Sequence, residues 1–266
     1  PYYIGQVIKE KETLLENTPE SFSELTGATV LTGIEATKLD RQAKVVYATN
    51  IKTGEELTYD YDKLVIATGA RPVKPNLPGI ELKNIFTLRD PDDADAIKAA
   101  VASGEVKRAV IVGGGAIGLE MAENLTKLGV RSSIIDMAEH VLPGYDGDFA
   151  AFAENELADH GIPTFLNDAI TSFEGEGRVQ KVRTGKRAIK TDMVIMSIGV
   201  RPNTEWLAGS GLNFVEGTSI LDVDENMRTN DEDIYAAGDC AMVRNLVTGA
   251  NQWTPMGSTA NIAARL

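Results

Sequence analysis

The run from Val110 to Glu120, Val-Ile-Val-Gly-Gly-Gly-Ala-Ile-Gly-Leu-Glu, constrains this chain most, because in it an apolar strand meets a helix through glycines. Gly113 suits a tight turn, Gly115 lets a phosphate approach the backbone, and Gly118 lets the helix lie close to the strand. The helix, expected from Leu119 to Leu128 and closed by Gly129, directs its N-terminal amides at the same point. The pattern predicts a pyrophosphate site.

A second apolar strand, residues 132–136, ends in Asp136, where a dinucleotide fold places its ribose-binding acid. The glycine fingerprint alone is weak evidence, but here it joins a strand to a helix and has its acid in register, so we predict dinucleotide binding. A carboxylate accepts both ribose hydroxyls and repels a 2′-phosphate, and residues 137–139 offer no arginine, which favours NADH over NADPH. The alternatives are a glycine turn without a ligand and a strand-end carboxylate without one.

Composition narrows the class of protein. With 266 residues, 43% hydrophobic and 24% charged, the chain suits a soluble globular protein of one large or two ordinary α/β domains. The net charge of −13 argues against nucleic acid and anionic membrane as partners. We recognise no signal peptide and no apolar run of the ~20 residues of a membrane span, so we expect a cytoplasmic protein. His140 and His160 cannot build a typical metal site, and we expect none.

Strand and helix patterns alternate, which predicts a doubly wound α/β architecture. Continuous apolar runs at 63–67 and 192–197 are typical of parallel strands covered on both faces. A capping residue followed by proline predicts helix starts at Thr18 and Asp90. An amphipathic helix is expected from Gly147 to His160, with three side chains turned inward: Phe149, Phe152 and Leu157.

Three of the apolar strands end in a similar way, at Ala67-Thr-Gly69, Ser197-Ile-Gly199 and Ala237-Gly-Asp239. In parallel sheets, ligands gather beyond the carboxyl ends of the strands, and glycine there lets the backbone approach a flat or charged ligand. Each of these ends alone could be an ordinary strand-to-loop glycine. Together with the dinucleotide turn, they indicate ligand-binding edges.

These motifs, in this order and with Ala-Arg-Pro after Gly69 and Val-Arg-Pro after Gly199, resemble the FAD-dependent pyridine nucleotide-disulfide oxidoreductases over essentially the whole chain. Residues 1–5 are similar to the segment after the redox cysteine in the coenzyme A-disulfide reductase, NADH oxidase and NADH peroxidase branch. Residues 254–261 resemble its helix start beneath the flavin. The resemblance implies a Rossmann-like NAD(P)H-binding domain, 87–206, inserted in an FAD-binding domain of the same type, 1–86 and 207–266.

The resemblance also implies site residues. Asp239 would accept a hydrogen bond from a ribityl hydroxyl, and the helix near Gly257 would direct its amides at the flavin's pyrimidine edge. Glu120, the one catalytic candidate, would lie near the nicotinamide and the flavin, although it could be a solvated helix residue. The residues implied for FAD are Thr68, Gly69, Gly238, Asp239, Gly257 and Ser258. Those implied for NADH are Gly113, Gly115, Ala116, Ile117, Gly118, Asp136 and Gly199.

Two departures from the family pattern limit what can be carried over. Ala116 stands where most members place Tyr or Phe as a gate over the flavin, which implies a more open nicotinamide pocket. The first glycine fingerprint, the redox cysteine and the C-terminal dimerisation domain are absent, so we take the chain as a fragment that does not turn over. The only cysteine, Cys240, is expected to be a packed structural residue, because the charge of Asp239 would raise its pKa.

The parent protein is expected to pass hydride from NADH to FAD and then electrons to a cysteine sulfur. The final acceptor would be a small molecule, namely a disulfide such as that of coenzyme A, a persulfide, a peroxide or dioxygen, and the parent would be a homodimer. Two alternatives stay open: a thiol-free ferredoxin- or rubredoxin-type reductase, and a nucleotide-binding module without turnover. The sequence does not identify the acceptor.

Overall fold

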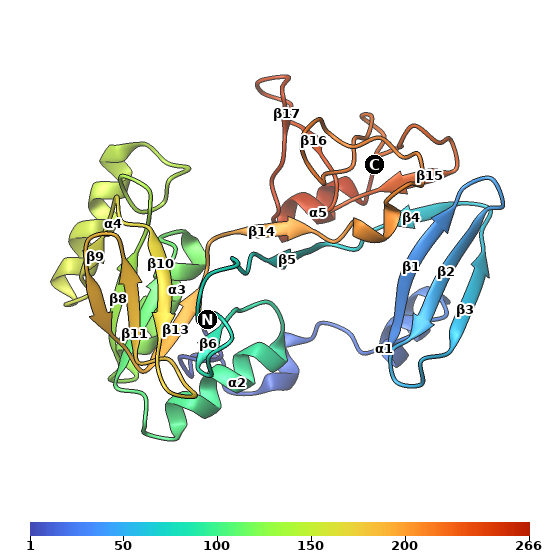
Figure 1. The fold of residues 1–266 in the computed structure, drawn as a ribbon. Coiled ribbons are helices and arrows are strands. Elements are labelled where there is room, and N and C mark those ends of the chain that lie inside the picture. Colours follow the sequence, from blue (N-terminus) through green and yellow to red (C-terminus); the bar gives the residue numbers. More distant parts are fainter. The chain divides into compact units, whose positions relative to one another are not determined.

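The computed structural model describes residues 1–266, which form two compact units (Figure 1). The first comprises Pro1–Glu16 and Pro72–Gly199, and the second comprises Asn17–Arg71 and Val200–Leu266. This division differs from the predicted boundaries at 86/87 and 206/207. Residues 1–16 join the first unit because Ile4 is fully buried in its core, beside Ile97 and Met121.

A five-stranded parallel sheet forms the centre of the first unit. Its strands lie in the order β6 (Ile85–Phe86), β13 (Met193–Met196), β7 (Arg108–Val112), β8 (Arg131–Ile135) and β9 (Thr164–Phe165). From β7 the chain continues to β8 on one side, whereas β13 lies on the other side. The strand order therefore reverses between β7 and β13, which is where doubly wound sheets bind their ligands.

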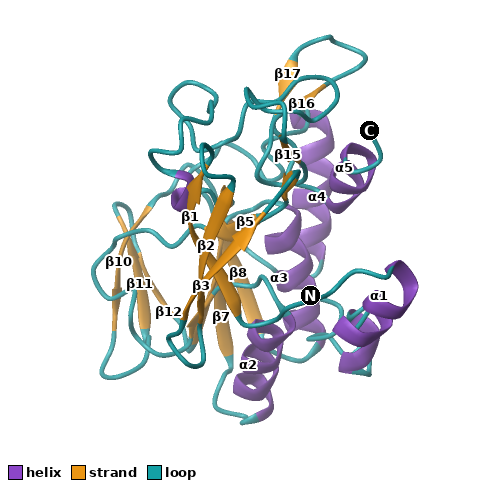
Figure 2. Ribbon diagram, turned by 90° about the vertical axis from the view of Figure 1, so that its right-hand side faces the viewer, coloured by secondary structure: helices purple, strands orange, loops and turns teal.

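Different elements cover the two faces of this sheet, as Figure 2 shows. On one face Ile111, Ile134 and Ile195 pack against helices α2 (Pro91–Ala102), α3 (Ala116–Lys127) and α4 (Gly147–Asp159). On the other, Val110, Ile135 and Val194 pack against a small antiparallel sheet of β10 (Ile170–Glu174), β11 (Lys181–Thr184) and β12 (Ala188–Lys190). Alternating side chains enter the two cores, as period-two strands require.

Helix starts follow the predicted caps. Asp90 Oδ1 accepts hydrogen bonds from the backbone N–H groups of Asp92 and Asp93, with proline at the first helical position of α2. Thr18 and Ser21 form a capping box at the start of α1 (Pro19–Thr26). A short 3₁₀ helix, Lys11–Leu14, lies in the N-terminal segment.

The predicted inward face of α4 is partly wrong. Leu157 is buried, but Phe149 and Phe152 are 67% and 78% exposed. At 100° per residue, Ala150 and Leu157 lie on the same side of the helix, and this is the side that packs on the sheet. Phe152 lies on the opposite side.

The second unit is built from small sheets. β1 (Ile34–Asp40), β2 (Val45–Asn50) and β3 (Glu56–Asp60) form an antiparallel meander. β4 (Leu64–Ile66) pairs in parallel with β15 (Ile234–Ala236), and the other pairs are β5 (Ala70–Pro72) with β14 (Val200–Pro202) and β16 (Val243–Arg244) with β17 (Asn251–Gln252). A 3₁₀ turn, Glu205–Leu207, and helix α5 (Gly257–Ala263) complete it.

Strand β4 is not covered on both faces as predicted. Ile66 is buried with Leu39 and Ile234, but Val65 is 63% exposed. Successive side chains of the strand point to opposite faces, and the face that carries Val65 is exposed.

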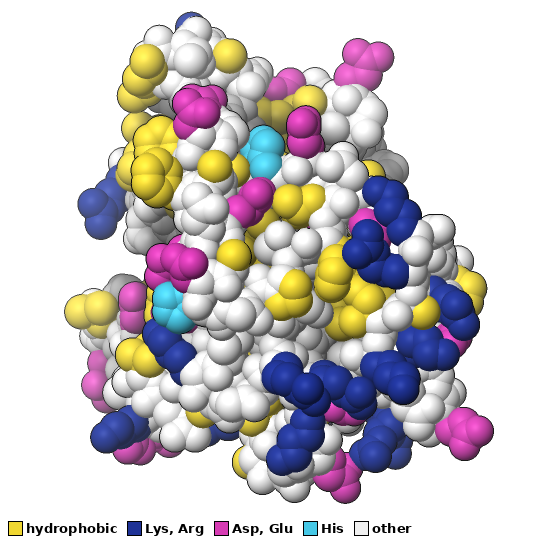
Figure 3. Space-filling view, turned by 90° about the vertical axis from the view of Figure 1, so that its left-hand side faces the viewer, with side chains coloured by type: hydrophobic (Ala, Val, Ile, Leu, Met, Phe, Trp, Pro, Cys, Tyr) yellow, Lys and Arg dark blue, Asp and Glu magenta, His cyan; other side chains and the backbone are white.

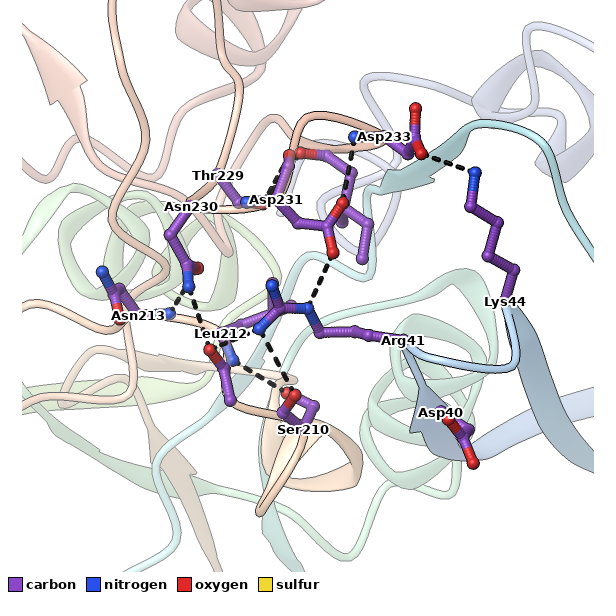
Figure 4. Close-up of polar contacts among 12 residues, drawn as sticks. Asp40, Arg41, Lys44, Ser210, Leu212, Asn213, Thr229, Asn230, Asp231 and Asp233 are labelled. Carbon is purple, nitrogen blue, oxygen red and sulfur yellow. Dashed lines mark hydrogen bonds and ion pairs between the residues drawn. The ribbon is translucent and has the colours of Figure 1, made fainter.

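Ion pairs fasten the segment that leads into β15 (Figure 4). Lys44 Nζ lies 2.5 Å from Asp233 Oδ2, and Lys63 binds the other oxygen of the same carboxylate. Hydrogen bonds from the two lysines lower the pKa of Asp233. Arg41 Nε donates to Asp231 Oδ2 at 2.8 Å.

No helix of the structure combines the length and the apolar character needed to cross a membrane.

Candidate coenzyme-binding site

The fingerprint turn lies where the strand order of the first unit reverses. Gly113 follows β7 with a φ of +109°, and a Cβ there would stand 2.3 Å from the carbonyl oxygen of Ser197. A Cβ on Gly118 would stand 1.9 Å from the carbonyl oxygen of Gly113. Glycine at these positions therefore allows the tight turn and the close approach of α3 to β7.

Ser197, which the sequence did not single out as a site residue, joins two strand ends. Its hydroxyl lies 3.0 Å from both the Val112 and the Gly113 carbonyl oxygens, so it ties the carboxyl end of β13 to that of β7. Its place at the end of the second apolar run was the available signal. Ser197 thus fixes the start of the fingerprint turn to the end of β13.

The outer side of the turn is open to a ligand. Gly115, the N-cap of α3, has no atom within 4 Å of where its Cβ would be, and no side chain caps the helix. The first-turn amides of α3 are therefore available to a phosphate, in a helix of 12 residues. Ala116 and Ile117 are exposed at this end.

Asp136 directly follows β8 and turns back towards the fingerprint. Its Oδ2 accepts a hydrogen bond of 2.6 Å from the backbone N–H of Gly114, and its Oδ1 accepts one of 2.8 Å from Ala138. A carboxylate has about four acceptor positions, so each oxygen keeps one for a hydroxyl. Beside it Met137 is 78% exposed.

These residues fit the diphosphate and one ribose of a dinucleotide. The glycine backbone leaves the space that a side chain would fill, the helix N-terminus faces it, and the acid stands beside it. Gly199, in the connection from β13 to β14, has a φ of +99° and likewise has open space where a Cβ would be.

Glu120 is half-buried one turn into α3. It lines a groove of about 320 Å³ between α3 and α4, together with Leu119, Thr126, Ala153, Leu157 and His160. The predicted position of Glu120 near a nicotinamide stays a prediction.

A second candidate edge lies in the other unit, at the carboxyl ends of β4 and β15. Gly69 and Gly238 both have left-handed backbones, with φ of +65° and +81°. Thr68 is held by Asn203: its hydroxyl donates to the Asn203 carbonyl at 2.7 Å, and the Asn203 amide donates back at 3.0 Å. The two parallel strands thus end in two glycine turns.

The remaining predicted flavin residues lie in the same unit. The carbonyl oxygen of Asp239, just after Gly238, accepts a hydrogen bond of 3.0 Å from Trp253 Nε1. Gly257 and Ser258 begin α5 and are exposed. Glycine turns at two strand ends, with a carboxylate after one of them, fit a flavin nucleotide, and the individual contacts stay predictions.

Cys240 is fully buried, as predicted. Its Sγ lies 3.4 Å from the Ile66 carbonyl oxygen and 3.3 Å from that of Ala237. Its pKa is raised, as predicted, but the main cause is burial rather than the charge of Asp239. A buried thiol with a raised pKa is a poor nucleophile.

No group of three or more His, Cys, Asp or Glu side chains is placed to hold a metal ion. His160 forms the C-cap of α4, as expected, and its Nδ1 lies 3.4 Å from Glu156 Oε1. This position suits a cation at the negative end of the helix dipole.

Comparison with known proteins agrees with this geometry. The family described as pyridine nucleotide-disulphide oxidoreductase matches residues 2–258. NADH oxidase of Enterococcus faecalis is 35% identical over 97% of this chain and 57% of its own length. The CoA-dependent NAD(P)H sulfur oxidoreductase of Pyrococcus abyssi is 34% identical over 97% of this chain and 57% of its own length. The chain therefore spans somewhat more than half the length of these relatives.

Solved structures show the same fold. The NAD-dependent persulfide reductase from A. fulgidus superposes with a TM-score of 0.94 at 35% identity, covering 100% of this chain and 50% of that one.

Proposed function

The chain belongs to the pyridine nucleotide-disulphide oxidoreductase family, and from this premise we propose that the whole protein, of which this chain is a part, transfers hydride from NADH to FAD and passes the electrons on to a sulfur or oxygen acceptor. The observation that carries the proposal is the open glycine turn that leads from β7 into α3, with the Asp136 carboxylate hydrogen-bonded beside it.

Each unit would hold one nucleotide. Gly113, Gly115, Gly118 and Asp136 would hold NADH, with Gly199 and Glu120 near its nicotinamide. The strand-end residues Thr68, Gly69, Gly238 and Asp239, with the start of α5 at Gly257 and Ser258, would hold FAD. A bound FAD would supply the chemistry that accepts a hydride and releases electrons to the acceptor. The residues of this chain bind and orient the nucleotides.

NADH is the proposed coenzyme. Two backbone hydrogen bonds fix the Asp136 carboxylate. Its remaining acceptor positions can bind the two hydroxyls of a ribose, whereas its negative charge would repel a 2′-phosphate. The name of the A. fulgidus persulfide reductase includes NAD dependence, which supports this choice.

The acceptor of the whole protein is proposed by class. Relatives are named NADH oxidase, CoA-dependent NAD(P)H sulfur oxidoreductase and NAD-dependent persulfide reductase, which supports dioxygen or a sulfur compound such as a persulfide. We keep the disulfide of coenzyme A and a peroxide as further candidates. A thiol-free reductase that serves a redox protein is a second candidate, supported by the likeness to the reductase of the putidaredoxin reductase–putidaredoxin complex, which is 27% identical with a TM-score of 0.89. We further propose that the whole protein is cytoplasmic and, as the family resemblance implies, a homodimer.

The test is calorimetric titration of this chain with NADH and with NADPH. We expect saturable heat with NADH and a dissociation constant at least tenfold higher for NADPH. Absence of heat at millimolar NADH, from a sample shown by circular dichroism to be folded, would overturn the coenzyme site. Oxidation of NADH by the whole protein, assayed with each acceptor in turn, then identifies the acceptor.

A further inference from the structure

An unusually basic hairpin lies in the first unit. Residues 178–190 contain no Asp or Glu, although the whole chain has a net charge of −13. Their cations are Arg178, Lys181, Arg183, Lys186, Arg187 and Lys190. On the face shown in Figure 3, Lys and Arg side chains gather together, whereas Asp and Glu are scattered.

Two of these cations, at the turn between β11 and β12, bind the loop that follows β9. Arg187 Nε lies 2.8 Å from Oδ2 of Asp168, an ion pair whose N–H is not aligned as a hydrogen bond. The Arg187 guanidinium also stands over the Phe165 ring, 4.7 Å from its centre. Lys186 Nζ donates to the Asn167 carbonyl oxygen at 2.5 Å.

The turn itself is built to present these two side chains. The buried Thr184 accepts hydrogen bonds at its Oγ1 from the backbone N–H groups of Lys186, at 3.1 Å, and Arg187, at 3.0 Å. Its own N–H donates to the Arg187 carbonyl oxygen at 2.9 Å. The backbone that carries both cations is therefore fixed.

The loop that they bind holds the main chain around Asp136. The N–H of Asp136 donates to the Phe165 carbonyl at 3.0 Å, and the Asp136 carbonyl accepts from the N–H of Asp168 at 2.9 Å. The N–H of Asn167 donates to the Ala138 carbonyl at 2.8 Å. Loop 165–168 thus holds Asp136 and Ala138 through three backbone hydrogen bonds.

We infer that Lys186 and Arg187 are positioning residues for the coenzyme: they hold loop 165–168, which in turn fixes the Asp136 carboxylate where it receives the adenosine ribose. The inference rests on the proposed NADH site. It adds two cations that touch no coenzyme but determine how well NADH is distinguished from NADPH.

The buried side chain of Asp168 makes loop 165–168 dependent on Arg187. The carboxylate is only 1% exposed, and Arg187 is its only ion-pair partner in the structure. Removing one member of a buried pair leaves an uncompensated charge, so the loop would rearrange rather than keep it. The rearrangement would reach Asp136 through the hydrogen bond between the Asp168 N–H and the Asp136 carbonyl.

The experiment compares three ligands on Arg187→Gln, Lys186→Gln and their double variant. NADH and NADPH carry the adenosine ribose, whereas reduced nicotinamide mononucleotide lacks it. We expect the double variant to bind NADH about tenfold more weakly, to bind the mononucleotide unchanged, and to discriminate less between NADH and NADPH. Binding is measured by calorimetry.

Arg183→Gln is the matched control. It removes a cation from the same hairpin, but Arg183 pairs with Glu174 and touches neither Asp136 nor loop 165–168. It should leave all three affinities unchanged. In the Asp136→Ala background, the Lys186 and Arg187 substitutions should have no further effect on NADH binding, because the group that they position is absent.

Two outcomes would overturn the inference: unchanged NADH binding by a folded double variant, or equal losses for NADH and the mononucleotide. If the double variant does not fold, the conservative Arg187→Lys, which keeps the charge but not the planar group, provides the same comparison. Failure of the unaltered chain to bind NADH would instead refute the proposed function.

Discussion

The backbone N–H of Gly114 donates a hydrogen bond of 2.6 Å to Oδ2 of Asp136, so the middle of the fingerprint turn is bound directly to the acid that ends the next strand. The phosphate site and the ribose site are therefore one rigid arrangement. A change at either residue should alter the affinity for the coenzyme before it alters the fold.

Asp136→Asn tests the acid. The amide keeps one oxygen acceptor but loses the charge, so we expect the dissociation constant for NADH to rise about tenfold, the equivalent of roughly 1.4 kcal/mol. The loss for NADPH should be smaller, because the repulsion of the 2′-phosphate disappears. Asp148→Asn, an exposed acid in the first turn of α4, is the control and should change neither value. Equal losses for both coenzymes would contradict the assigned role.

Gly115→Ala and Gly113→Ala separate binding from folding. The methyl group at 115 meets no protein atom, so the variant should stay folded and bind NADH at least tenfold more weakly, because the group occupies the space of the phosphate. At 113 the methyl group would meet the Ser197 carbonyl in a left-handed backbone, so we expect a loss of unfolding free energy of about 3 kcal/mol. Urea unfolding and calorimetry measure the two effects. Unimpaired NADH binding by Gly115→Ala would show that the phosphate does not lie there.

Local signals predicted much of this fold. The caps at Thr18 and Asp90, the apolar strand before Gly113 and the acid after β8 depend on residues close together in the sequence, and the structure contains each of them. The burial of Cys240 was predicted correctly as well, although its main physical cause is desolvation.

Features that depend on which element covers which face could not be predicted in this way. Val65 belongs to a continuous apolar run, but whether both faces of such a run are covered depends on which other elements pack over the sheet. The contact between Arg187 and Asp168 joins a hairpin turn to a loop 19 positions earlier, and no periodic pattern in the sequence indicates it. Nor does any pattern in residues 1–16 indicate that this segment packs with the first unit.

The ion pair of Asp192 should make the free energy of unfolding depend on pH. Hydrogen bonds from Arg108, aided by the backbone N–H of Lys107, lower the pKa of this carboxyl and tie β13 to β7. A lowered pKa contributes stability above the ordinary value of about 4, and that contribution is lost as the pH falls through the folded-state value. Asp192→Asn should therefore cost about 1–2 kcal/mol of unfolding free energy at pH 7 and progressively less below pH ~4.

Urea unfolding at pH 7 and pH 3 measures this difference, with Asp60→Asn, an exposed acid at the end of β3 and outside any helix, as the control. A cost for Asp192→Asn that is the same at both pH values would show that the charge of the carboxyl contributes nothing.

Helix α4 offers a direct comparison of an inward and an outward apolar residue. Leu157→Ala should cost about 2–4 kcal/mol of unfolding free energy, because it leaves a cavity in the core cluster that also contains Met121 and Ile134. Phe152→Ser should cost less than about 0.5 kcal/mol, since the ring is 78% exposed. Urea denaturation of both variants tests the burial pattern. A large loss for Phe152→Ser would mean that the ring is covered in solution.

Cys240 should be inert in the folded chain. Burial raises its pKa and removes it from solvent, so a thiol reagent at pH 8 should label none of the native protein and one site after denaturation. Cys240→Ala should leave NADH binding unchanged, because the thiol lies in the other unit from the fingerprint turn. Counting labelled thiols by mass spectrometry measures both states. Rapid labelling of the native chain would contradict a structural role and would make this sulfur a candidate for electron transfer.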